Sequence, residues 1–71
     1  MFKMKIDGQY NAIDRTLICG TPNTKIVPLK LKINGQYFKL IGRSYGGDLA
    51  NISLEIEKTN KNLIDQIAYG E

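Results

Sequence analysis

Residues 29–40 read LKLKINGQYFKL, in which two alternating runs flank Asn34-Gly35. An Asn-Gly or Asp-Gly pair between strand-like runs is the strongest short-range signal for a two-residue β-hairpin, because both residues accept the positive φ angles of a type I′ turn. With that turn, one face of the hairpin is Leu29, Leu31, Ile33, Phe38 and Leu40, and the other is Lys30, Lys32, Tyr37 and Lys39. A slip of one residue would expose the whole apolar set, so we expect a well-specified register.

The same pattern occurs earlier in the chain. Residues 2–10 read FKMKIDGQY and residues 29–37 read LKLKINGQY, at a constant offset of 27 positions. We therefore predict two hairpin units, one around residues 2–13 that turns at Asp7-Gly8 and one around residues 29–41. In the first unit, side-chain alternation gives an inner face of Phe2, Met4, Ile6 and Ile13 and an outer face of Lys3, Lys5 and Tyr10, with Lys5 opposite Tyr10.

The last third of the chain contains two different periods. Ile52, Leu54 and Ile56 alternate with polar residues, which favours a strand around 51–57 over a helix that begins near Asp48. Around 60–69, apolar residues fall instead on one side of a helix that Gly70 would end. The predicted fold is a single mainly β domain over residues 1–71: a small antiparallel barrel or half-open sheet of five to six strands with one short C-terminal helix.

Composition excludes several classes of function. The 71 residues include one cysteine and no histidine, so an internal disulfide and a four-ligand zinc site are both excluded. No apolar run approaches the roughly 18 residues that span a bilayer. We expect a cytoplasmic protein with no membrane association and no cofactor, for which homo-oligomerisation is one way to reinforce so small a core.

The sequence contains few residues that could act in catalysis. Histidine, the usual general base, is absent. Cys19 lies in an apolar run, where an inert thiol is the normal finding. Glu55 and Glu57 share one face of a strand and form the one candidate acid pair, but outward glutamates usually serve solvation. We expect a protein that is not an enzyme.

Charge is distributed unevenly. The net charge is +3, yet residues 1–45 carry eight Lys and Arg against Asp7 and Asp14, a net +6, and the remainder carries −3. This asymmetry indicates a basic surface for an anionic partner. The candidate partner-binding residues are Lys3, Lys5, Tyr10, Lys30, Lys32, Tyr37 and Lys39 on the hairpins, with Arg43 and Tyr45 on the glycine-rich segment that follows.

Two classes of partner fit these residues. Lysines contact phosphates as point charges and tyrosine rings offer bases a stacking platform, so nucleic acid is the first expectation. An acidic protein surface is the alternative, which would make the chain a small inhibitor or regulator of the phage or mobile-element type. Such an inhibitor would block a host protein by complementarity or by strand addition.

Overall fold

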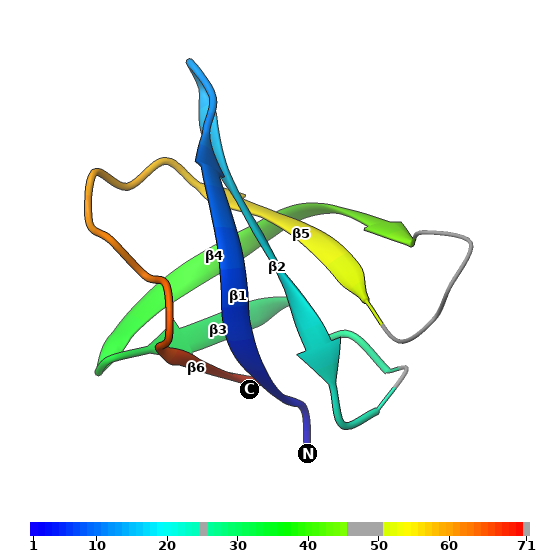
Figure 1. Ribbon diagram of the computed structural model, residues 1–71. Coiled ribbons are helices and arrows are strands. Elements are labelled where there is room, and N and C mark those ends of the chain that lie inside the picture. Colours follow the sequence, from blue (N-terminus) through cyan, green and yellow to red (C-terminus); the bar gives the residue numbers. More distant parts are fainter. Residues whose placement is uncertain (25, 46–50, 71) are drawn as a thin grey trace.

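Six strands close into an antiparallel barrel in the computed structural model, which describes residues 1–24, 26–45 and 51–70 (Figure 1). The strands are β1 (Lys3–Asn11), β2 (Arg15–Pro22), β3 (Lys30–Ile33), β4 (Gln36–Tyr45), β5 (Ile52–Glu57) and β6 (Ile67–Gly70). Their order around the barrel is β1-β2-β5-β4-β3-β6, and β6 closes it by pairing with both β1 and β3. The prediction of a small antiparallel β-barrel is confirmed, in its closed form.

The barrel interior is filled by alternate side chains from all six strands. The buried apolar residues are Phe2, Met4, Ile6, Ile18, Leu31, Ile33, Phe38, Ile52, Leu54, Ile56, Leu63 and Ala68. In β5, every second residue points inward, as the alternation predicted. Apart from the buried Thr16 of β2, this packed interior leaves most polar residues of the strands on the outer surface, where we look for a candidate site.

The hairpin predicted around 29–41 is confirmed in its turn and register. Asn34 and Gly35 have φ angles of 50° and 81°, as a type I′ turn requires. Lys32 lies opposite Tyr37, and Lys30 lies opposite Lys39. One predicted core residue is wrong: Leu29 is 83% exposed, because β3 begins only at Lys30.

The hairpin predicted around 2–13 is wrong. The chain does not turn at Asp7-Gly8, because β1 continues to Asn11 and pairs with β2 along its length, with an irregularity in register between Ile6 and Gly8. Gly8 serves close packing instead, since a Cβ there would lie 2.7 Å from the Cys19 Sγ. The turn comes later, and Ile13, predicted to be in the core, is fully exposed.

The helix predicted around 60–69 is also wrong, and the described residues contain no helix. Side chains of the barrel strands form hydrogen bonds with backbone groups of this segment. The Gln9 amide accepts from Leu63 N at 2.7 Å and donates to Lys61 O at 2.8 Å, and the buried Thr16 hydroxyl accepts from Thr59 N at 3.0 Å. These bonds, with local turns, replace helical ones. They hold residues 59–63 in a non-helical conformation that leads into β6.

Residues 46–50 of the glycine-rich segment lie outside the described residues, and its first part belongs to β4. Over the part of the chain that the structure describes, no helix is long and apolar enough to cross a membrane.

Candidate functional site

Two tyrosines and two lysines form a transverse row over four neighbouring strands. Tyr37 on β4 lies opposite Lys32 on β3, Lys32 lies opposite Tyr69 on β6, and Tyr69 lies opposite Lys3 on β1. Residues that are directly opposite in a ladder project to the same face of the sheet. The four side chains therefore alternate, ring and ammonium, around the outside of the barrel; we call them the Tyr/Lys row.

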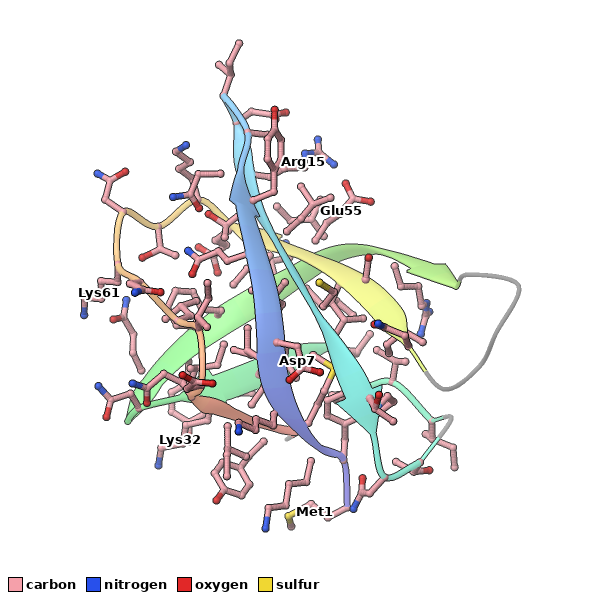
Figure 2. The ribbon with its side chains drawn as sticks, viewed as in Figure 1. Met1, Asp7, Arg15, Lys32, Glu55 and Lys61 are labelled. Atoms are coloured by element: carbon pink, nitrogen blue, oxygen red, sulfur yellow. The ribbon has the colours of Figure 1, made fainter. Side chains whose placement is uncertain are left out.

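The spacing of the Tyr/Lys row follows from the sheet. Neighbouring strands lie about 4.8 Å apart, so the two rings are separated by about 10 Å and the whole row spans about 15 Å. Both rings remain accessible, because Tyr37 is 49% and Tyr69 42% exposed. Figure 2 shows Lys32 on the outer side of the barrel next to β6.

Ammonium groups lie over both rings. The Lys3 Nζ is 5.9 Å from the centre of the Tyr69 ring, and those of Lys30 and Lys32 are 5.0 and 5.3 Å from the centre of the Tyr37 ring. At exposed sites such contacts contribute about 0.5–1 kcal/mol each. They orient the rings and keep positive charge beside them.

Three further lysines surround the Tyr/Lys row. Lys30 and Lys39 face one another between β3 and β4, a like-charge opposition that is unfavourable unless water or an anion separates the groups. Lys5 lies two residues along β1 from Lys3 and its Nζ is 3.8 Å from the Asp65 carboxylate, with both side chains well exposed. The Tyr/Lys row together with Lys5, Lys30 and Lys39 is here named the basic face.

The structure separates the other predicted site residues from the basic face. Tyr10 lies opposite Leu17 of β2 rather than Lys5, and it is seven residues along β1 from Lys3, about 23 Å away. Arg43 is exposed but lies on the part of β4 that pairs with β5, six residues along the strand from Tyr37. Tyr45 ends β4, and its side chain lies outside the described part of the structure.

Tyr69 is the member of the basic face that sequence reasoning missed. It was placed at the end of a helix, where no ladder partner could be assigned to it. A local signal existed, since Ile67-Ala68-Tyr69-Gly70 alternates and contains two strand-favouring residues. Asn62 and Asp65 just before it are turn residues, and the Asn62 side chain does accept from Ile64 N.

A second group of charges, around Arg15, has a structural explanation. The Arg15 guanidinium binds Glu55 at 2.6 Å and holds both oxygens of Asp14, at 3.0 and 3.2 Å. Hydrogen bonding to Arg15 lowers the pKa of Asp14, and the same bonds raise the pKa of Arg15. Figure 2 shows the Arg15–Glu55 pair at the opposite end of the barrel from Lys32. These charges satisfy one another and form no part of the basic face.

The basic face combines fixed positive charge with flat apolar rings, an arrangement suited to a chain of phosphates that carries planar groups. Among the described residues, no group of three or more Cys, Asp or Glu side chains is placed to hold a metal ion. In comparisons with known proteins, no family model, no curated protein and no solved structure matches this chain.

Proposed function

We propose that this protein binds single-stranded nucleic acid on the basic face, without catalysing a reaction. The observation that carries the proposal is the Tyr/Lys row, which places ring, ammonium, ring and ammonium on four adjacent strands. Bases stack on the two rings in place of the ammonium groups that lie over them, and the displaced lysines contact the phosphates. Because every base has a π-face, such a surface is tolerant of sequence.

A single strand suits this surface better than a duplex. In a duplex the bases are already stacked on one another, so exposed rings on a convex barrel reach only the backbone. Unstacked bases can instead lie against the Tyr37 and Tyr69 rings, and each such contact contributes about 1–3 kcal/mol. The flanking lysines then add a salt-dependent term without selecting a sequence.

The alternative, a protein inhibitor that acts by strand addition, has less support. Strand addition needs an unpaired sheet edge. The barrel is closed, so strand addition is limited to stretches with a ladder partner on one side only, such as the part of β4 after Leu40, because β4 pairs with β3 only over residues 36–39. A partner strand on such a stretch would not use the Tyr/Lys row, which leaves the placement of the two rings unexplained.

The first prediction concerns salt dependence. A fluorescent 12-nucleotide oligothymidylate is expected to bind at about 20 mM salt, and the plot of log K against log salt concentration should have a slope of about −2 to −3.5 if three to five phosphates are contacted. Fluorescence anisotropy measures both quantities. An abasic strand of the same length and charge is the control, and weaker binding of that strand isolates the contribution of stacking. Absence of binding at low salt would overturn the proposed function.

The second prediction tests the stacking contribution of one ring. Tyr69→Leu keeps an apolar side chain but removes the ring, and we expect about tenfold weaker binding with an unchanged salt slope. Tyr10→Leu is the matched control, because Tyr10 is a more exposed tyrosine (68%) that lies away from the basic face. Equal losses in the two variants would contradict the assignment of the site.

A further inference from the structure

A groove lies at one end of the Tyr/Lys row, on the outer side of β3 and β4. It has a volume of about 540 Å³, within the range of small-molecule sites, and it is lined by Leu29, Lys30, Tyr37, Phe38, Lys39 and Glu57. Its lining combines two apolar walls, two cations and one carboxylate. This mixture equips the groove to recognise a polar planar group.

Leu29 has no role in the core. Its side chain is 83% exposed although its backbone carbonyl accepts from Leu40 N at 3.0 Å, so the leucine is held in place on the surface. It lines the groove together with the Tyr37 ring. An aliphatic side chain and an aromatic ring on the same groove provide apolar contact area for a flat group.

Glu57 supplies an oriented acceptor. One oxygen of its carboxylate accepts from Lys39 N at 2.6 Å, which ties the side chain to the backbone of β4. An ionised carboxylate has about four lone-pair sites, so it retains capacity to accept further bonds and cannot donate. A ligand in this groove must therefore present N–H donors to Glu57 and acceptors to Lys30 and Lys39.

We propose that this groove binds an unstacked guanine of the single strand, an inference that rests on the function proposed above. Guanine has adjacent N1–H and N2–H donors on one edge, which match a carboxylate, and O6 and N7 acceptors, which match a lysine. Thymine and uracil place carbonyl oxygens on both sides of their single N–H, so one of them would face the Glu57 carboxylate. Adenine and cytosine place a ring lone pair beside their amino group, which weakens the same contact.

The experiment measures binding of 12-nucleotide oligothymidylates that carry dG, dA, dC or deoxyinosine at one central position, with unsubstituted oligothymidylate as the reference. We expect about tenfold tighter binding with dG than with thymidine at that position, which corresponds to one good bidentate contact. Deoxyinosine, which lacks the N2 amino group, is expected to fall between the two.

Glu57→Gln tests the assigned acceptor. A glutamine can still accept from Lys39 N but cannot accept two further N–H bonds as the carboxylate does, so the dG preference should fall below about twofold while general affinity rises slightly. Asp7→Asn makes the same charge change at an exposed carboxylate of β1 that does not line the groove, and should leave the dG preference intact.

The outcomes separate the two proposals. Equal affinity of the unchanged protein for all the oligonucleotides would overturn the guanine site and leave the proposed function standing. The same holds for a preference for dG that Glu57→Gln does not alter. Failure of every oligonucleotide to bind at low salt would overturn both.

Discussion

The Gly20→Ala variant is expected to lose about 3 kcal/mol or more of its unfolding free energy. Gly20 lies on β2 with its missing side chain directed at β1, and a Cβ there would be 2.1 Å from the Lys5 carbonyl oxygen and 3.0 Å from the Met4 Cγ. The nearer atom belongs to the backbone of a strand that is paired on both sides, with β2 and with β6. It cannot move away without breaking a ladder, so the cost exceeds the usual range for overpacking.

This loss is large in relation to the whole molecule. A chain of this length has a total stability of roughly 4–10 kcal/mol. A change of 3 kcal/mol lowers the melting temperature of such a small domain by about 12–24 °C. Thermal unfolding followed by circular dichroism measures the shift, and urea titration at 25 °C gives the corresponding free energy.

Gly35→Ala is the matched control for that measurement. It makes the same chemical change at a residue with a φ of 81° but with no atom within 4 Å of the new Cβ. It should cost only the strain of a left-handed alanine, about 1 kcal/mol. If the two variants were equally stable, β1 and β2 would not approach at Gly20 as closely as the structure shows.

The two copies of the repeated segment show what local sequence can and cannot predict. Around residues 29–41 the hairpin forms as predicted, because Asn34-Gly35 adopts the turn and the apolar face packs into the barrel core. The first copy has the same local pattern, but there β1 continues through Asp7-Gly8, pairs with β2 on one side and pairs with β6 on the other. Whether the chain turns or continues as a strand depends on pairing with residues that are distant in sequence. A local sequence pattern gives no information about those residues.

The candidate site was predictable in part for the same reason. Lys32, Tyr37, Lys30 and Lys39 were assigned correctly to one face, since their register follows from a two-residue turn. Tyr10 was paired wrongly with Lys5, because that pairing assumed the hairpin that does not form. Tyr69 was missed, since its neighbours in space are Lys3 and Lys32, which are 66 and 37 positions away in the sequence. A row that crosses four strands becomes visible only when the barrel closes.

The closure also changes what the duplication means. As two hairpins, the copies would present two equivalent Lys/Tyr pairs. In the barrel, each copy contributes different parts of one surface: Lys3 and Lys5 come from the first, and Lys30, Lys32 and Tyr37 from the second. β6 lies between them and adds the second ring. The basic face is therefore a product of topology rather than of a repeated motif.

Lys32→Glu is expected to weaken binding of a single-stranded 12-mer by roughly thirtyfold at low salt, which corresponds to the loss of about 2 kcal/mol for one charged contact. Lys32 lies between the two rings of the Tyr/Lys row, opposite Tyr37 on one side and Tyr69 on the other. Reversal of its charge removes an ammonium at the centre of the binding path and places a carboxylate there. The salt slope should become shallower by at least about 0.7, since one phosphate contact is lost.

Lys58→Glu distinguishes a local contact from a general effect of net charge. Lys58 is an exposed lysine that donates to the Ala12 carbonyl, next to the β1–β2 turn and outside the Tyr/Lys row. Both variants change the net charge by the same amount, so a partner attracted only by the overall field would respond equally to them. We expect Lys58→Glu to cost less than about threefold, because Lys58 makes no contact within the Tyr/Lys row and its change acts only through the general field of the protein. Comparable losses would remove the argument for the Tyr/Lys row, whereas a tenfold difference between the variants at equal melting temperature locates the binding path between Tyr37 and Tyr69.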